Sequence, residues 1–383
     1  MKRVFLLNNR GFSWNSSEHC FVKGYFFDKS EMLYRDDDLL DYFEKVDSFA
    51  DFEERVRYAN GCFSVVVKKD QDLFIAVDKI RSMPLFYARM EGNWIVSDNP
   101  YYIAGKGGFT EKNALGAMEF MATGYVTGNE TLVEGVRQVQ ASEIIHLKQD
   151  DLFAKFYYTF RVSDTLDEEY KDMKVAGVRV FENSFRRLLQ SMQGKTAVIP
   201  LSGGYDSRFI ATMFKKFGYD KVICFTYGRK GNPEIKISSE TAKKLGFPWY
   251  YIEYNDKLIN NYIKESEFRD YYRFASNLVS MFFMQEYFAV KYLKENDLIP
   301  ENSVFIPGHS GDFLGGSQLN KHGNLNLEED DKAIVQRIYH VKYCYKKPSG
   351  KDISRIQERI NRSLKEIYHG KQSLAYSMHE DWD

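Results

Sequence analysis

Residues 196–245 decide how the rest of this chain is interpreted: TAVIPLSGGYDSRFIATMFKKFGYDKVICFTYGRKGNPEIKISSETAKKL. An apolar run at 196–201, typical of a buried strand, leads into Ser202-Gly203-Gly204-Tyr205-Asp206-Ser207. A helix is expected next, with one apolar face formed by Phe209, Ile210, Met213, Phe214 and Phe217. Paired glycines at a strand-to-helix turn let the backbone approach a ligand closely, and the free N–H groups of the first helical turn attract phosphate.

The chemistry of this loop differs from that of a Walker-type loop, because no Gly-Lys-Ser/Thr follows the glycines. It offers two hydroxyls and the carboxylate of Asp206, which suit a Mg²⁺ ion bound to phosphate oxygens. The Ser-Gly-Gly-x-Asp-Ser order resembles the pyrophosphate loop of the ATP pyrophosphatases, which transfer AMP from ATP to a carboxylate or carbonyl oxygen. The resemblance implies ATP and Mg²⁺ as cofactors, with nucleotide contacts from Leu201, Ser202, Gly203, Gly204, Asp206 and Ser207. An ordinary Gly-Ser turn is the alternative interpretation.

A second loop, PGHSGDFLGG at 307–316, follows an expected strand at 303–306. It resembles the second signature of the asparagine synthetases, Ser-Gly-Glu-Gly-x-Asp-Glu-x-x-Gly-Gly, but is one residue shorter, with His309 and Phe313 in place of the two Glu residues. The resemblance aligns Asp312 with a carboxylate that shares Mg²⁺ with the first loop. It therefore implies Asp206 and Asp312 as metal ligands and Gly308 as a further nucleotide contact. His309 is predicted either to accept a proton from an incoming amine or only to fix the loop.

Strands and helices alternate through the second part of the chain. Helices are expected at 169–192, 234–245 and 277–294, and strands at 221–227 and 249–254. This alternation predicts an α/β domain, residues 168–383, with a doubly wound parallel sheet and ligands at the carboxyl ends of its strands. Thr226, Tyr227 and Gly228 end the second strand, where the resembled family holds adenine with backbone groups, so they are predicted nucleotide contacts.

The first part, residues 1–162, is rich in short strands and predicts a layered α+β domain. The expected strands are 3–7, 20–27, 62–67, 73–77, 85–88, 94–97 and 143–147, and the expected helices are 37–45, 51–58 and 111–122. Gly61-Cys-Phe-Ser-Val-Val and Asp78-Lys-Ile-Arg-Ser-Met-Pro-Leu-Phe-Tyr resemble the glutaminase domain of class II amidotransferases, an N-terminal-nucleophile fold. That family uses an N-terminal cysteine, whereas position 2 here is Lys2, and neither Cys20 nor Cys62 can supply the free amine beside the thiol. A degenerate glutaminase-like domain without glutaminase activity is expected.

The composition argues against nucleic-acid binding, secretion and a membrane span. The 383 residues are 44% hydrophobic, with 53 basic and 54 acidic side chains, so no global basic field favours nucleic acid. The N-terminal apolar run is too short for a signal peptide, and no stretch is apolar and long enough to span a membrane. The four cysteines are widely scattered, which favours buried free thiols in a cytoplasmic protein.

Together these features resemble an asparagine synthetase relative. The resemblance implies an AMP-forming carbon–nitrogen ligase that activates a small-molecule carboxylate as an acyl-adenylate for attack by ammonia or an amine. Relatives with this altered second loop suggest a sugar acid in surface-polysaccharide assembly. A peptide or β-lactam cyclase is the alternative with the same chemistry. Two alternatives belong to other functional classes: a non-catalytic nucleotide-binding subunit and a tRNA-thiolating enzyme. Neither paired cysteines nor a basic surface supports the tRNA-thiolating enzyme.

The last part of the chain carries three weaker expectations. Residues 315–332 are polar and rich in Gly and Asn, and form either a lid over the site or a surface insertion. Residues 352–367 carry an apolar helical stripe that packs on its own domain or, less often, on a partner helix. The resembled family's Leu-Glu-x-Arg-x-Pro-Phe segment is missing after Asp312. We therefore expect a chain that is truncated or one part of a split enzyme, weakly active or inactive alone, with a partner chain or a homo-oligomer as the candidate that completes the synthetase domain.

Overall fold

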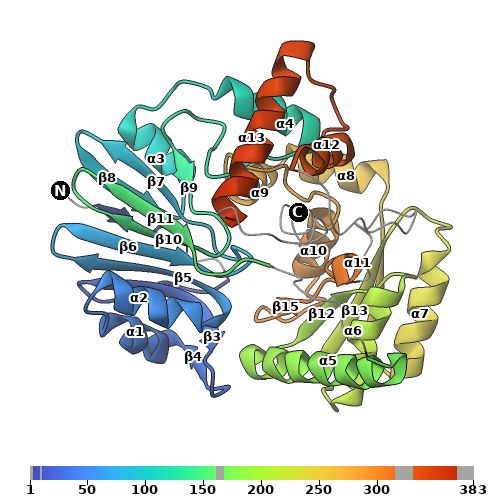
Figure 1. The fold of residues 1–383 in the computed structure, drawn as a ribbon. Coiled ribbons are helices and arrows are strands. Elements are labelled where there is room, and N and C mark those ends of the chain that lie inside the picture. The colour runs from blue at the N-terminus through green and yellow to red at the C-terminus, as the bar shows by residue number, and fades with distance from the viewer. Residues whose placement is uncertain (1–2, 9–10, 161–167, 315–330, 369–383) are drawn as a thin grey trace. The chain divides into compact units, whose positions relative to one another are not determined.

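The chain forms two compact units (Figure 1). The computed structural model describes residues 3–8, 11–160, 168–314 and 331–368, and only the backbone at Asp312, Phe313, Asp331 and Tyr368. One unit comprises Met1–Thr165, Arg273–Met281 and Leu325–Asp383, and the other comprises Leu166–Tyr272 and Phe282–Asn324. The sequence predicts one change of domain, between residues 162 and 168, whereas the chain returns to the first unit twice more.

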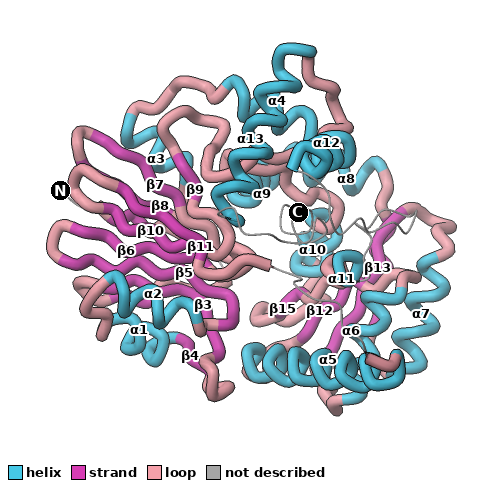
Figure 2. The backbone as a smooth tube through the Cα atoms, viewed as in Figure 1, coloured by secondary structure: helices cyan, strands magenta, loops and turns pink. Residues whose placement is uncertain are grey.

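The first unit contains two β-sheets (Figure 2). The larger sheet has the order β11-β10-β6-β5-β3-β2 with β4 on β3, and the smaller has the order β1-β8-β7-β9. The strands of the larger sheet are β2 (Asn15–Ser16), β3 (Cys20–Phe27), β4 (Leu33–Arg35), β5 (Asn60–Lys69), β6 (Asp72–Val77), β10 (Glu143–Leu147) and β11 (Leu152–Phe156). Those of the smaller sheet are β1 (Val4–Phe5), β7 (Phe86–Met90), β8 (Asn93–Ser97) and β9 (Arg137–Gln138).

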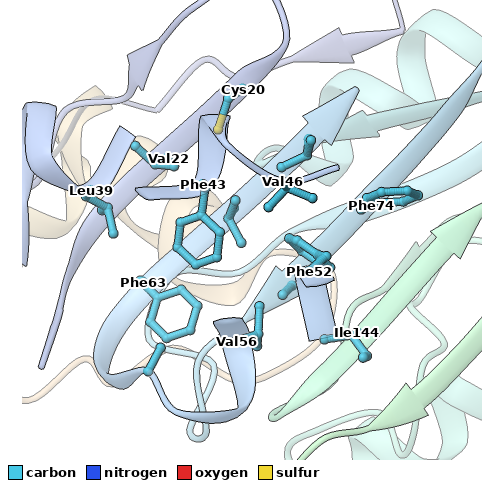
Figure 3. Packing of buried hydrophobic residues seen from close by; sticks show 14 of the residues in the cluster. Cys20, Val22, Leu39, Phe43, Val46, Phe52, Val56, Phe63, Phe74 and Ile144 are labelled. Carbon is cyan, nitrogen blue, oxygen red and sulfur yellow. The ribbon is translucent and has the colours of Figure 1, made fainter. Parts of the chain in front are cut away.

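Apolar side chains hold these sheets in layers. Val66 and Ile75 of the larger sheet share a buried cluster with Val96 of the smaller one. Helices α1 (Asp36–Glu44) and α2 (Phe49–Arg57) cover the other side of the larger sheet, where Phe43 and Phe52 pack near Phe63 (Figure 3). Ile103 of α3 (Pro100–Gly107) packs with Phe86 and Ile95 of the smaller sheet. The result is the layered α+β arrangement expected from the sequence; its assignment to the N-terminal-nucleophile type stays a prediction.

Three helices from distant parts of the sequence complete this unit. Ile356, Ile360 and Leu364 of α13 (Gly350–Tyr368) pack with α12 (Asp331–Lys342) and with Ala122 of α4 (Ala114–Thr123). The apolar stripe predicted at 352–367 therefore faces neighbours inside the first unit. The prediction of one continuous domain over 168–383 is corrected, because an apolar stripe shows that a helix face is buried but not which domain buries it.

Residues 277–294 do not form the single helix expected. Helix α9 (Ser266–Ser276) ends before them, and Asn277 and Leu278 adopt positive φ values of 47° and 59°. The next residues pair with the first unit's backbone: Val126 N–H donates to the Val279 carbonyl at 2.8 Å, and Met281 N–H donates to the Gly124 carbonyl at 2.6 Å. Only α10 (Tyr287–Glu295) is helical, so tertiary pairing overrides the helical pattern here.

The second unit contains a parallel sheet of order β14-β13-β12-β15. Its strands are β12 (Ala197–Pro200), β13 (Val222–Gly228), β14 (Trp249–Glu253) and β15 (Val304–Phe305). One face packs against α5 (Tyr170–Met192), α6 (Tyr205–Lys216) and α7 (Glu234–Leu245) through Phe185, Phe214 and Ala242. The other face packs against α10 and α8 (Asp256–Lys264) through Ala289, Leu293 and Leu258. Helices on both faces of a parallel sheet confirm the predicted α/β class.

Two further expectations concern membrane-spanning helices and the state of the cysteines. No helix among the described residues is both long and apolar enough to cross a membrane. All four cysteines are free thiols, with Cys20 and Cys224 buried and Cys62 half-buried. Cys344 is exposed, so the prediction of buried thiols is wrong at that position.

Candidate functional site

The first candidate loop joins β12 to α6 at the point where the strand order reverses. Strand β12 lies between β13 and β15, so the loops after β12 and β15 leave the same edge of the sheet. In open α/β sheets, ligands bind in the crevice at such a reversal. The fold therefore brings the two loops singled out from the sequence to one place.

Side chains close the first loop on itself. Ser202 N–H donates to the Ser207 hydroxyl at 3.0 Å, the two hydroxyl oxygens lie 3.0 Å apart, and Gly204 N–H donates to the Ser202 hydroxyl at 3.1 Å. A Cβ at Gly203 would come within 3.2 Å of the Ile237 side chain, and one at Gly204 within 3.3 Å of the Ser202 hydroxyl. The glycines are thus explained by close packing, since neither has a positive φ.

The second loop packs directly on the first. It leads from β15 into the short helix α11 (Gly311–Leu314). A Cβ at Gly308 would lie 2.9 Å from the Ser207 nitrogen, and a Cβ at Gly311 would overlap the carboxyl group of Asp206. These two glycines let the loops touch, so that the Asp206 carboxylate lies against the second loop. The side chain of Asp312, the other predicted metal ligand, is outside what the structure describes.

A cavity of about 530 Å³ opens between these loops and the end of β13. The predicted site residues that line it are Leu201, Ser202, Asp206, Ser207, Thr226, Tyr227, Gly228, Gly308 and His309. Gly203 and Gly204 are not among the lining residues. Further lining residues that the sequence analysis did not select are Arg229, Asn232, Glu234, Tyr254, Gln285 and Glu286.

The strand end at Thr226 and Gly228 is held by fixed hydrogen bonds. The Thr226 hydroxyl donates to the Leu201 carbonyl at 2.7 Å and accepts from the Trp249 indole N–H at 2.9 Å, so it ties β13 to β14 and to the start of the first loop. Gly228 has φ of 143°, which favours glycine, and its carbonyl accepts from the Tyr251 hydroxyl at 2.8 Å. The Thr226 hydroxyl is thus already engaged within the protein, and backbone contacts with a ligand at this strand end fit the geometry.

Glu286 is the functional candidate that the sequence analysis missed. It lines the cavity, and its Oε1 atom lies 3.7 Å from Nε2 of His309. The Glu286 side chain is only 18% exposed, against 60% for His309. Burial raises the pKa of Glu286, and the facing histidine partly offsets this rise. Glu286 was placed inside the helix wrongly expected at 277–294, which hid its position at the start of α10.

Aromatic rings form another part of the cavity wall. Tyr227 and Tyr254 stack with ring centroids 5.0 Å apart, and burial raises the pKa of Tyr227 to about 12. The Phe283 ring lies 5.0 Å from the His309 ring in an edge-on arrangement. Both tyrosines line the cavity, so one part of it is aromatic and suited to a flat ring, and the loops form the polar part.

Whether this site could bind a metal ion depends on the few carboxylates that line it. Among the described residues, no group of three or more His, Cys, Asp or Glu side chains could hold a metal ion. Mg²⁺ usually binds proteins through one or two carboxylates and completes its shell with water and substrate phosphates. The Asp206 carboxylate, which lines the cavity between the two loops, fits that mode.

Comparisons with known proteins point to one family. Residues 179–348 match the family model described as asparagine synthase. A probable glutamine-hydrolysing asparagine synthetase from Acanthamoeba polyphaga mimivirus is 26% identical over 144 residues, 36% of this chain. The match spans about a quarter (24%) of that relative's length.

Solved structures give weaker likenesses. The ammonia-dependent NAD synthetase of Campylobacter jejuni aligns with 52% of this chain and 96% of its own, at 13% identity and a TM-score of 0.26. The glutamine phosphoribosylpyrophosphate amidotransferase of B. subtilis aligns with 64% of this chain and 51% of its own, at 9% identity and a TM-score of 0.24.

Proposed function

The chain is a member of the asparagine synthetase-like family, and on that premise we propose that it joins ammonia or an amine to a carboxylate while ATP is split to AMP and pyrophosphate. In the first step a carboxylate oxygen attacks the α-phosphorus, and the bond to the pyrophosphate oxygen breaks. In the second step the amine nitrogen attacks the acyl carbon, AMP leaves, and one proton passes from nitrogen to a base. The observation that carries the proposal is the contact of Asp206 with the second loop beside a cavity of about 530 Å³.

Positioning and charge neutralisation would supply most of the rate enhancement. The Ser202 and Ser207 hydroxyls would receive the departing pyrophosphate together with the start of α6, which has no side-chain cap. Asp206 would hold a Mg²⁺ ion that neutralises phosphate charge, together with Asp312 as the resemblance implies. The adenine ring would lie at the end of β13, near Tyr227 and Gly228.

The proton of the incoming amine needs an acceptor, and His309 is the candidate that we favour over a purely structural role. Its neighbour Glu286 is poorly exposed and, with 3.7 Å between Oε1 and Nε2, close enough to balance the charge that the imidazole gains. His309→Gln separates the two roles. If His309 is the base, ATP–pyrophosphate exchange persists and amide formation falls at least tenfold. If His309 only fixes the loop, both activities fall together.

The cysteines of the first unit support a proposal about the nitrogen source. Burial raises the pKa of the Cys20 thiol to about 12 and also raises the pKa of the Cys62 thiol, so neither is an activated nucleophile. Lys2, on which the prediction first rested, lies outside the described residues. We therefore propose that ammonia or a substrate amine, and not glutamine hydrolysed by this chain, supplies the nitrogen.

The substrate proposal is a sugar acid used in polysaccharide assembly, and it rests on the resemblance of the second loop alone. A screen of carboxylates in an ATP–pyrophosphate exchange assay tests it. Exchange that depends on a uronic or related sugar acid, and not on aspartate, would support the proposal. Exchange with aspartate alone would replace it with ordinary asparagine synthesis.

A further inference from the structure

A second cavity, of about 550 Å³, lies wholly within the first unit. Its floor is the start of β10 and the end of β11, and its wall is one face of α13, the red helix of Figure 1. It is as large as the cavity beside the two loops, and the proposed synthetase reaction does not use it. The charged residues that line it therefore need a separate explanation.

The wall of this cavity carries both signs of charge. Arg362 and Lys365 line it together with Glu358 and Glu366. Arg362 is spaced to pair with either glutamate along the helix, yet no ion pair joins any of these four side chains to a described residue. Such i,i+4 pairs would contribute only a few tenths of a kcal/mol, so they would compete little with a ligand for these side chains.

The floor of the cavity is polar, and its buried carboxyl group, that of Glu143, is only about half ionised near pH 7. Glu143 is 3% exposed, and burial raises its pKa to about 7. Its carboxyl accepts the Gln140 N–H at 2.8 Å. The remaining charge of the floor, the ammonium of Lys155, is already paired with Glu53. Hydrogen-bonding groups on the floor and separated opposite charges on the wall suit a ligand that is neutral overall but carries both charges.

The wall is also held in place before any ligand arrives. Arg359, one turn before Arg362, is buried and bonds to Glu119 at 2.6 Å and to Glu130. Glu130 in turn accepts from the Asn113 amide at 2.6 Å. A wall fixed in this way loses little conformational freedom on binding, which favours affinity.

We propose that this cavity binds a small zwitterion of the free α-amino-acid type. The ligand carboxylate would lie at Arg362 and Lys365, its ammonium at Glu358 and Glu366, and its side chain toward Gln140 and Glu143. The proposal does not rest on the proposed synthetase activity, because all of these residues belong to the first unit.

Three double variants of the full chain test the site. Arg362→Gln/Lys365→Gln removes the carboxylate end, and Glu358→Gln/Glu366→Gln removes the ammonium end. Lys351→Gln/Arg355→Gln removes two exposed cations from the same helix that do not line the cavity, and serves as the matched control. All six side chains are exposed, so the fold should tolerate each change.

The twenty proteinogenic amino acids would be screened by thermal shift and the best of them measured by calorimetry. We expect both cavity variants to weaken binding at least tenfold and the control to leave it unchanged. We also expect the deaminated and the decarboxylated analogue of the same amino acid each to bind at least tenfold more weakly. No saturable binding, binding insensitive to both cavity variants, or equal binding of either analogue would overturn the proposal.

Discussion

The contact that fastens α13 to the rest of the first unit gives the sharpest prediction about stability. Glu119 is completely buried on α4, and its Oε2 atom lies 2.6 Å from Nη1 of Arg359, which is itself only 11% exposed. Glu119 also accepts from the Tyr343 hydroxyl at 3.1 Å. Arg359→Met keeps the apolar stem and the volume but leaves the Glu119 carboxylate without its cation.

Breaking a buried ion pair by removing one partner costs about 3–5 kcal/mol. Because about 1.4 kcal/mol corresponds to a tenfold change in an equilibrium constant, the opening of α13 should become roughly 100- to 4,000-fold more frequent. The two units need not unfold in one transition, so a global unfolding curve would not isolate the opening of α13. Amide hydrogen exchange measures this opening locally. We expect protection of the Ile356, Ile360 and Leu364 amides to fall by that factor.

Arg355→Met, on the exposed face of the same helix, is the matched control. Among the described residues Arg355 forms one ion pair, a long one to Asp352 at 3.9 Å, so its loss should change protection less than threefold. If Arg359→Met reduced protection less than tenfold, or no more than Arg355→Met did, the inferred role of the buried pair would be refuted. Partial recovery in Arg359→Met/Glu119→Gln, where the uncompensated carboxylate is gone, would strengthen the argument.

Three further predictions concern other positions. Gly311→Ala should lower nucleotide turnover at least tenfold in a pyrophosphate-release assay, because its Cβ would displace the Asp206 carboxyl, whereas Gly177→Ala, with open space around it, should leave turnover unchanged. Glu143 has a folded-state pKa of about 7, above its unfolded value near 4.5. The free energy of unfolding of the first unit should therefore fall by about 3 kcal/mol as the pH rises from 4 to 8. Urea titrations across this pH range should show most of that loss removed in Glu143→Gln. Purified protein should release no glutamate from glutamine, and steady release measured by a coupled assay would show that the first unit has been misinterpreted.

The sequence predicted the elements that local pattern alone determines. Strands β3 and β10 match their expected ranges residue for residue, because both are largely apolar runs that end up buried. The two loops were located because their glycines and carboxylates follow strands in a recognisable order. The structure adds the reason for Gly308 and Gly311, which is loop-to-loop contact that no single stretch of sequence contains.

Features that depend on distant partners could not be predicted in this way. Residues 277–281 have a helical pattern but pair with the 124–126 backbone, and the resulting break places Glu286 at the cavity. The stripe on α13 predicted burial, yet Arg359 and its partners Glu119 and Glu130, more than 200 residues away, determine which unit buries it. Long-range pairing of this kind carries no local signal.

The central claim is that ATP is cleaved between its α and β phosphates to activate a carboxylate. Its most direct test is Mg²⁺-dependent exchange of labelled pyrophosphate into ATP, measured for the full chain across a panel of carboxylates, with Asp206→Asn as the control. The account predicts exchange with at least one carboxylate, AMP as the nucleotide product once an amine is added, and loss of both in Asp206→Asn. Release of ADP and phosphate, or exchange that survives in Asp206→Asn, would contradict it.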